Sequence, residues 1–285
     1  MKKIISGKVR DIYEVDQNSL MIVVSDRISA FDNIMPQDVR DKGVILNQIS
    51  AFWFDYVSDI VPNHMITNKL EEFPTEFQKE EFCGRSMWVK KLKMLPVECI
   101  VRGYITGSAW KDYNSTGEIC GTKILKDMKE SEKFAEALFS PSTKAEIGDP
   151  DENISFEKVV ELLGLELAEK VKTTAIAIYN KCADYALTRG IILADTKFEF
   201  GLDENGGLVL GDEAMTPDSS RFWPSDKYEV GRGQESFDKQ YLRDWLKEKG
   251  YVDKAPETLP HEVRDITRAK YIDCYEKIIG KKFEH

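Results

Sequence analysis

The chain has 285 residues, a formal net charge of -10 and 42% hydrophobic residues. This length suits one large domain or two lobes, each with its own core. The acidic balance argues against a nucleic-acid-binding protein, because phosphate contacts need clustered Lys and Arg, although it leaves room for a local basic pocket that holds a small anion.

The N-terminus and the cysteines indicate the compartment. The first residues, MKKIISGKVRDIY, carry charges where a signal peptide needs an apolar core, and no apolar run reaches the length of a membrane span. The five cysteines form no CxxC pair and no Cys/His cluster of zinc spacing. We therefore expect a soluble, cytoplasmic protein without disulfides and without a membrane partner.

The first part of the chain is predicted to be rich in strands. Residues 4–15 predict two strands around a tight turn at Gly7, flanked by Lys8 and Arg10. Backbone N–H groups of such a turn can approach phosphate oxygens, and an ordinary hairpin is the alternative. Residues 20–25 predict a buried strand, and the polar segment 25–32, SDRISAFD, follows it directly. That position favours either a functional loop or a plain Asp-rich turn.

A helix and two further strands follow. Apolar residues repeat at helical spacing over residues 42–59, and Pro62 ends the pattern. Residues 86–93 and 96–105 predict two strands with a very short connection at Met94 and Leu95. We expect the strand-rich first part to end there, and such a junction is a usual place for a ligand cleft.

The segment after Arg102 favours an anion site. Gly103, Gly107 and Ser108 predict the start of a short helix, whose N–H groups and dipole attract negative charge. A simple Ser N-cap is the alternative. Residues 127–138 predict an exposed helix, and residues 140–155 predict a long polar loop that is either functional or mobile.

Helices and a hairpin come next. Ser155 is predicted to cap a helix that ends at Gly164, and a longer helix runs up to Gly190. Residues 191–210 then predict a hairpin whose dipeptide Asn205-Gly206 fits a two-residue type I′ turn.

The hairpin carries a row of ionisable side chains. Strand alternation places Asp195, Lys197 and Glu199 on one face, and a two-residue turn places Glu199 directly opposite Asp212. Two opposed carboxylates repel each other, so we expect a cation between them, and a divalent metal is the natural candidate. A solvated, exposed pair is the alternative.

A second anion site is predicted near the end of this region. Arg221 lies between two serines and the aromatics Phe222 and Trp223, and it is suited to a bidentate phosphate contact. Stacking on Trp223 is the alternative. Two amphipathic helices, near residues 237–249 and 261–279, complete the chain.

Together these features predict a nucleotide cleft with Mg²⁺ and a second pocket for a phosphorylated substrate, and hence phosphoryl transfer. The P-loop, the HRD and DFG motifs of protein kinases and the GxGxxG turn are absent from the sequence. The pattern leaves the phosphoryl acceptor open.

Eight segments, in this order along the chain, resemble one enzyme family. They are GKVRDIYEV, VVSDRISAFD, KGVILNQIS, VKKLKMLPVECIVRGYITGSAWKDY, SPSTKAEIGDPDENISF, ILADTKFEFG, DEAMTPDSSRFW and SFDKQYLRDWL. The sequence resembles the phosphoribosylaminoimidazole-succinocarboxamide synthase (SAICAR synthase) family from near residue 6 to near residue 250. The resemblance implies a two-lobed α+β fold, with a strand-rich, kinase-like lobe at 1–94 and a larger α+β lobe at 95–285.

The resemblance also implies an activity. The family joins the carboxylate of carboxyaminoimidazole ribonucleotide (CAIR) to the amine of L-aspartate and converts ATP to ADP and phosphate. We expect ATP and Mg²⁺ as cofactors and an acyl phosphate as the intermediate. The rival hypotheses are a small-molecule kinase on a kinase-like fold and a nucleotide-binding regulatory module without turnover.

The family motifs imply roles for residues of the ATP site. The ATP phosphates would be covered by Gly7, Lys8, Val9 and Arg10. Lys90 and Met94 would border the adenine, and Glu199 and Asp212 would be the Mg²⁺-associated carboxylates.

The same motifs imply roles on the substrate side. The CAIR phosphate would be held by Arg102, Ser108 and Arg221. Asp195 and Lys197 would face the reacting end, where Lys197, Lys8 and Arg10 would stabilise charge on the phosphoryl oxygens. Substrate-side motifs also contain Asp32, Lys144 and Asp151. Many relatives have His where this chain has Pro150, so no role of that His is carried over.

Overall fold

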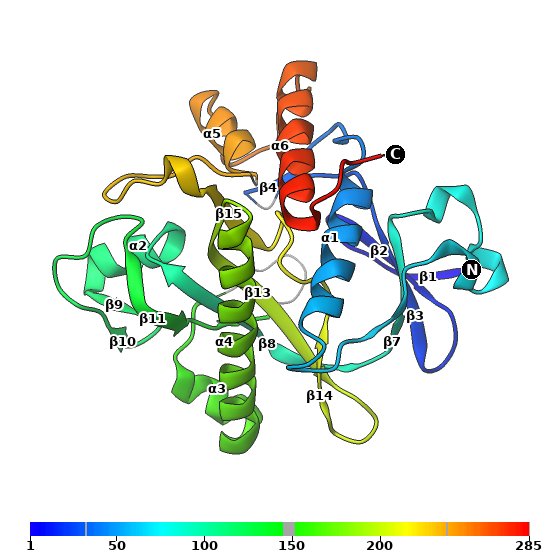
Figure 1. Ribbon diagram of the computed structural model, residues 1–285, viewed down its shortest axis with the longest axis horizontal. Helices are drawn as coiled ribbons and strands as arrows, with labels where there is room; N and C mark the ends of the chain where they lie inside the picture. The colour runs from blue at the N-terminus through cyan, green and yellow to red at the C-terminus, as the bar shows by residue number, and fades with distance from the viewer. Residues whose placement is uncertain (32, 145–151, 238, 285) are drawn as a thin grey trace.

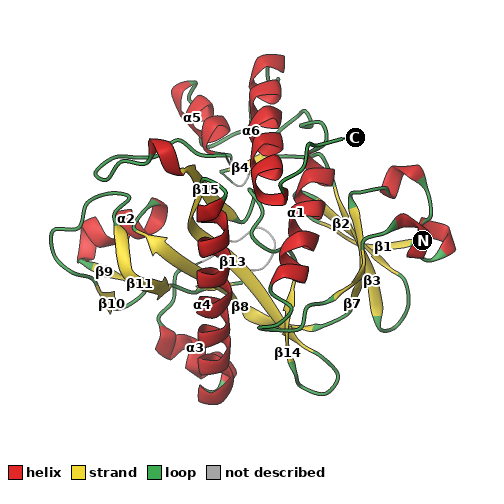
Figure 2. Cartoon of the chain, in the orientation of Figure 1, coloured by secondary structure: helices red, strands yellow, loops and turns green. Residues whose placement is uncertain are grey.

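The computed structural model describes residues 1–31, 33–144, 152–237 and 239–284, and it shows an α+β fold built on two main antiparallel sheets (Figure 1, Figure 2). The strands of the first sheet are β1 (Lys2–Ser6), β2 (Arg10–Glu14), β3 (Ser19–Val24), β6 (Met65–Thr67) and β7 (Ser86–Lys90). Their spatial order is β1-β2-β3-β7-β6.

The second sheet carries most of the charged residues predicted to be functional. Its strands are β8 (Lys93–Tyr104), β11 (Lys133–Phe139), β12 (Ser142–Thr143), β13 (Ile191–Leu202), β14 (Leu208–Gly211) and β15 (Ser220–Pro224). The main order is β11-β8-β13-β14, with β12 beside β8 and β15 beside β13. The long strands β8 and β13 therefore form its centre.

Three helices cover the sheets, and a fourth packs on one of these helices. They are α1 (Lys42–Tyr56), α3 (Phe156–Leu163), α4 (Leu165–Thr188) and α6 (His261–Ile279). Helix α1 contacts β3 and β7 of the first sheet, α6 packs beside α1, and α4 contacts β8, β11 and β13. Figure 1 shows α4 crossing the second sheet and α1 and α6 side by side.

Shorter elements complete the fold. The remaining α-helices of the described part of the chain are α2 (Gly107–Thr116) and α5 (Gln240–Glu248). Two-residue strands form the pairs β4 (Ser29–Ala30) with β5 (Asn33–Ile34) and β9 (Glu118–Ile119) with β10 (Thr122–Lys123). Single turns of 3-10 helix are η1 (Leu70–Glu72), η2 (Thr75–Phe77), η3 (Glu80–Phe82) and η4 (Ser225–Lys227).

Strand alternation divides the second sheet into an apolar face and a charged face. The side chains that pack toward α4 are fully buried and apolar, namely Val97, Cys99 and Val101 on β8 and Phe198 and Phe200 on β13. The intervening side chains, which include Glu98, Arg102, Lys197 and Glu199, point to the other face because successive strand residues alternate. Burial of the apolar face against α4 therefore fixes where the charges lie.

The structure confirms the predicted helices at α1, α3, α4, α5 and α6. Ser155 caps α3 by accepting a hydrogen bond from the backbone N–H of Lys158 at 3.4 Å. The predicted helix at 127–138 is wrong, because residues 133–139 form strand β11. Pairing with β8 and burial of Phe134 and Phe139 determine the conformation there, so tertiary context overrides local helix propensity.

The predicted register of the hairpin is also wrong by one residue, because Glu199 pairs with Gly211 and not with Asp212. The side chain of Asp203 accepts hydrogen bonds from the backbone N–H groups of Asn205 and Gly207 at 2.9 and 2.7 Å. Of the dipeptide Asn205-Gly206, only Gly206 has a positive φ, of 77°, whereas a type I′ turn needs two. The backbone N–H of Asp203 also donates to the carbonyl of Gly207 at 3.0 Å, so three residues, 204–206, form the turn within the five-residue connection 203–207.

The predicted connection between the two strands at 86–105 lies elsewhere. Strand β7 ends at Lys90 and β8 begins at Lys93, so Met94 belongs to a strand. Its partner is Gly201 on β13. Because this pairing extends β8 toward its N-terminus, residues 91–92 form the connection between the two sheets.

Candidate active site

The central feature of the charged face is a pair of opposed carboxylates. Glu98 on β8 and Glu199 on β13 are directly paired in the sheet, and their side chains are 8% and 9% exposed. The Nζ of Lys197 forms ion pairs with both, at 3.5 Å from Oε1 of Glu199. Burial disfavours the charge of Lys197, but Glu199 and Glu98 raise its pKa above the usual value.

Glu98 was not assigned a role from the sequence. It lies within the segment PVECIVRGYI, where strand alternation places it on the same face as Arg102. The presence of a glutamate in a mostly apolar strand is the sequence signal that could have identified Glu98 as a site residue. The prediction that Glu199 lies opposite Asp212 is wrong, and the carboxylate that Glu199 does oppose is that of Glu98.

Lys144 brings a second cation to this row. Its Nζ forms an ion pair with Oε2 of Glu199, although the lysine side chain itself is 40% exposed. Glu199 therefore contacts ammonium groups of both Lys144 and Lys197. The segment that carries Lys144 joins β12 to residues 145–151, which lie outside the described part of the chain.

Asp212 lies directly after β14 and joins the two sheets electrostatically. It has a φ of 57°, a conformation that few residues other than Gly adopt. Its Oδ1 accepts a hydrogen bond from Nη1 of Arg10 at 2.6 Å, and Nη2 of Arg10 lies 3.3 Å from Oε1 of Glu213. Burial would raise the pKa of Asp212, but Arg10 and Lys197 lower it.

The carboxylates of this region suit a hard divalent cation. Among the described residues, no group of three or more His, Cys, Asp or Glu side chains is arranged as a complete metal cage. Mg²⁺ commonly takes only one or two protein carboxylates, together with water and substrate phosphate oxygens. Glu199 and Asp212 supply the carboxylate oxygens that this mode uses. These oxygens pair with Lys144, Lys197 and Arg10 in the structure, so a bound cation would share or replace those contacts.

A second cluster forms around Asp195. Its Oδ2 accepts hydrogen bonds from Nη1 of Arg102, at 3.0 Å, and from Nη1 of Arg221. Arg102 also donates to the hydroxyls of Ser140 at 2.8 Å and Ser108 at 3.1 Å. The predicted residues Arg102, Ser108 and Arg221 are thus brought together, and Arg221 contacts Asp195.

The start of α2 lies against this cluster. The N-cap of α2 is Thr106, so the alternative in which Ser108 is a simple N-cap is wrong. Gly107 has a φ of 60°, and a Cβ atom there would lie 2.5 Å from Nη2 of Arg221. The glycine therefore allows the guanidinium to lie against the N-terminal turn of the helix, where two sources of positive potential combine.

A cavity of about 720 Å³ opens beside this cluster. Ser108 and Arg221 line it, together with Arg243 and Lys247 of α5. Acidic side chains line other parts of the cavity, namely Glu130, Glu235 and Asp244. Arg243 and Lys247 are four positions apart and share one helix face. Neither was given a role from the sequence motifs, although Arg243 lies within the family segment SFDKQYLRDWL and Lys247 directly follows it.

The residues predicted to border the adenine are less closely grouped. Lys90 and Met94 are exposed residues at the connection between the two sheets. A small cavity between the first sheet, α1 and Asp212 is lined by Arg10, Ile22 and Leu46 among others, but by neither Lys90 nor Met94. Asp32 and Asp151, and Pro150 with them, lie outside the described residues.

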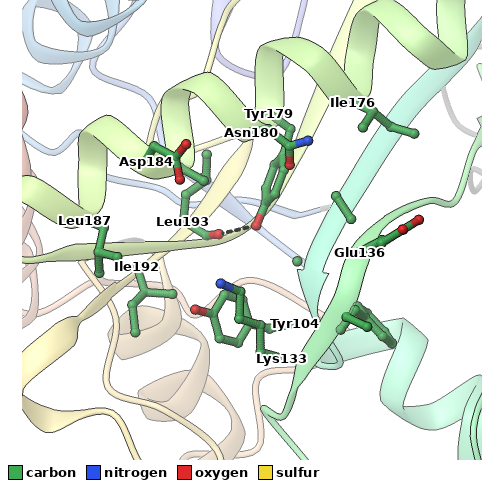
Figure 3. A pocket seen from close by; sticks show the side chains of 15 residues that line it. Tyr104, Lys133, Glu136, Ile176, Tyr179, Asn180, Asp184, Leu187, Ile192 and Leu193 are labelled. Carbon is green, nitrogen blue, oxygen red and sulfur yellow. Dashed lines mark hydrogen bonds between the residues drawn. The ribbon is translucent and has the colours of Figure 1, made fainter.

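A different cavity, of about 460 Å³, lies beside α4 (Figure 3). Tyr179 of α4 fills the space above Gly103, and its hydroxyl donates a hydrogen bond to the carbonyl of Leu193 at 2.6 Å. Of the residues named for the predicted anion and metal sites, only Gly103 lines this cavity, and it belongs to β8 and not to the start of α2.

The fold and the site define a class: an α+β protein in which buried carboxylates, paired with partly exposed lysines, adjoin a cavity lined in part by arginine and lysine side chains. Comparison with known proteins then assigns the family. The SAICAR synthetase family model matches residues 3–258. The chain belongs to the SAICAR synthetase family, as the sequence motifs predicted.

Individual relatives match along nearly their whole length. The phosphoribosylaminoimidazole-succinocarboxamide synthase of Lachnospira eligens is 55% identical over 284 residues, which cover 97% of this chain and 95% of the relative. The SAICAR synthase of Saccharomyces cerevisiae, solved in complex with SAICAR, is 45% identical with a TM-score of 0.92, over 99% of this chain and 96% of that chain.

A more distant relative was solved with a nucleotide. This SAICAR synthetase, in complex with ADP, is 27% identical with a TM-score of 0.73, over 99% of both chains. The likeness to these structures confirms the predicted α+β fold. No helix in the described ranges is both long enough and apolar enough to cross a bilayer.

Proposed function

We propose that the protein is an ATP-dependent ligase that joins CAIR to L-aspartate and gives SAICAR, ADP and phosphate. Family membership supports this reaction, since the relatives carry the name of that enzyme. The observation that carries it in the structure is that Arg102 and Asp195 lie on β8 and β13, the two strands that also carry the Glu98, Lys197 and Glu199 row. Arg221 reaches Asp195 from the neighbouring strand β15. Such a face offers a site for the substrate phosphate next to a site for phosphoryl transfer.

The CAIR ribose phosphate is assigned to the cavity of about 720 Å³, at the end where Arg221 lies. Ser108 and Arg221 line this cavity, and the buried Arg102 lies behind Ser108 and donates a hydrogen bond to its hydroxyl. Asp195 holds both guanidinium groups in place. A guanidinium that is already oriented loses little side-chain entropy when it binds a phosphate. Asp195 therefore acts as a positioning residue for both arginines.

ATP is assigned to the junction of the two sheets. The turn from Gly7 through Lys8 and Val9 to Arg10 would contact its phosphates, and Lys90 and Met94 would border the base. The relative solved with ADP supports nucleotide use. The oxygens of Glu199 and Asp212 would hold Mg²⁺, which would neutralise phosphate charge.

The reaction needs activation of a carboxylate, because oxide is a poor leaving group. A CAIR carboxylate oxygen attacks the γ-phosphorus of ATP, the bond to the β-phosphate oxygen breaks, and ADP leaves. The aspartate amine then attacks the carbonyl carbon of this acyl phosphate, phosphate leaves, and the amine loses a proton. Lys197, Lys8 and Arg10 would stabilise phosphoryl charge. Lys144 is assigned to the substrate side, and the family motifs assign Asp32 and Asp151, which lie outside the described residues, to the same side.

We also propose the division into a lobe at 1–94 and a lobe at 95–285. The two sheets support a two-part arrangement, and the connection at residues 91–92 lies close to this boundary.

Incubation with ATP, Mg²⁺ and CAIR, with and without L-aspartate, tests the proposal. A ligase forms the succinocarboxamide only when aspartate is present. A small-molecule kinase, the alternative, releases a stable phosphorylated product without aspartate, and that result would replace the proposed function.

A further inference from the structure

The segment that follows β3, which the proposed reaction does not yet use, holds the turn between β1 and β2. Nη2 of Arg27 donates to the carbonyl of Gly7, and Nε of Arg27 donates to the carbonyl of Lys8, each at 3.2 Å. The carbonyl of Val9 accepts hydrogen bonds from the backbone N–H of Ser25 at 2.9 Å and from its hydroxyl at 2.8 Å. Three successive carbonyl groups of the turn therefore point toward one segment.

This anchoring determines where the N–H groups of the turn point. A trans peptide unit is planar, and its C=O and the following N–H point in opposite directions. Carbonyls of residues 7 to 9 that face Arg27 and Ser25 therefore direct the N–H groups of residues 8 to 10 to the opposite side. Successive N–H groups on one side form a concavity that attracts anions.

Arg27 is itself held in place by a carboxylate. Its Nη2 lies 2.9 Å from Oδ1 of Asp11 on β2, and the two side chains are 29% and 14% exposed. Asp11 also accepts hydrogen bonds from the hydroxyl of Ser6 at 2.7 Å and from Nζ of Lys3 at 2.8 Å. One planar guanidinium thus spans a carboxylate and two carbonyls, a geometry that a lysine ammonium cannot reproduce.

We propose that Arg27 is a positioning residue that aims the N–H groups of the turn at Gly7–Arg10 toward the phosphates of a bound nucleoside diphosphate or triphosphate. The inference rests on the proposed function only in placing a nucleotide at this turn. It explains why polar residues follow the buried strand β3 directly. Arg27 acts through the backbone of the turn and contacts no reacting atom.

Calorimetric titration of the full-length protein with ADP and with adenosine tests this role without turnover. Three variants are compared with the wild type: Arg27→Ala, Arg27→Lys and, as a matched control, Lys3→Ala. Lys3 contacts Asp11 but makes no contact with the turn carbonyls that Arg27 binds. Thermal unfolding of each variant measures any general loss of stability.

Arg27→Ala is expected to weaken ADP binding by about tenfold or more, the scale of lost hydrogen bonds to a charged group. Adenosine affinity should stay within about twofold, because adenosine has no phosphate for the turn to contact. Arg27→Lys should recover only part of the loss, and Lys3→Ala should bind ADP like the wild type. In turnover assays the KM for ATP should rise while the KM for CAIR is unchanged.

Two results would overturn the inference. One is an Arg27→Ala protein with a lowered melting temperature and unchanged ADP affinity, which shows a purely structural role. The other is an equal loss of ADP and adenosine affinity, or no ADP binding to the wild type. A wild type that binds ADP as expected but makes no SAICAR would instead contradict the proposed function and leave the role of Arg27 supported.

Discussion

Arg102 and Arg221 donate hydrogen bonds to the same carboxylate oxygen, Oδ2 of Asp195. One negative charge therefore orients two positive ones, and the cluster keeps an excess of positive charge next to the start of α2. An arrangement of this kind is poised for a dianionic phosphate, which would supply the missing negative charge.

Removal of one of these arginines should weaken binding of the phosphorylated substrate. We expect Arg221→Ala to raise the KM for CAIR by about tenfold to a hundredfold, the scale of one charge-assisted bidentate contact, with the KM for ATP unchanged. Arg232, which pairs with Glu229 on the surface, provides the control variant Arg232→Ala. A raised KM for ATP and an unchanged KM for CAIR would show that Arg221 belongs to the nucleotide site.

Replacement of Lys197 should expose the repulsion between Glu98 and Glu199. We expect Lys197→Met to lower the free energy of unfolding by about 2 kcal/mol at pH 8, since two facing buried carboxylates lose the cation between them. Acidification toward pH 5 should reduce this loss as the pair takes up a proton. Urea unfolding across this pH range measures it, and the double variant K197M/E98Q should be less destabilised than K197M. A loss that does not depend on pH would contradict the interpretation.

Asp212 should matter for turnover more than for folding. We expect Asp212→Asn to keep its fold, as measured by circular dichroism, and to reduce kcat by orders of magnitude. Raised Mg²⁺ should restore part of the activity if the loss reflects metal affinity. Kinetics like those of the wild type at low Mg²⁺ would remove Asp212 from the metal site.

The burial of His64 should make the stability of the fold depend on pH. Its ring is buried against Phe54 near Asp212, and burial lowers its pKa from 6.5 to about 4. The unfolded chain therefore binds the proton more readily, so the contribution of His64 is complete above pH 6.5 and is lost as the pH falls toward 4. The full difference is about 3 kcal/mol. Urea unfolding at pH 7 and pH 5 should show a smaller pH dependence in His64→Phe than in the wild type.

Local sequence patterns predicted the parts of the fold that depend on local chemistry. Helical spacing identified α1 and α4, the Ser155 cap identified α3, and strand alternation placed Lys197 and Glu199 on one face. The residues expected to hold phosphate, Arg102, Ser108 and Arg221, do lie together.

Relationships between distant strands were not predictable in the same way. The partner of Glu199 is Glu98, about a hundred positions earlier, and only the pairing of β8 with β13 reveals it. The prediction of a two-residue turn at Asn205-Gly206 is wrong because hydrogen bonds to the Asp203 side chain stabilise a longer loop. Residues 133–139 form a strand because β8 offers them a partner, which no local propensity encodes.

The central claim is that a CAIR carboxylate is activated by phosphorylation and then captured by aspartate. CAIR labelled with ¹⁸O at both carboxylate oxygens tests it most directly, with ATP, Mg²⁺ and L-aspartate present. The account predicts one ¹⁸O atom in each phosphate released and the other in the new amide carbonyl of SAICAR. Released phosphate without ¹⁸O would contradict it, because the carboxylate oxygen would then never have been bonded to phosphorus.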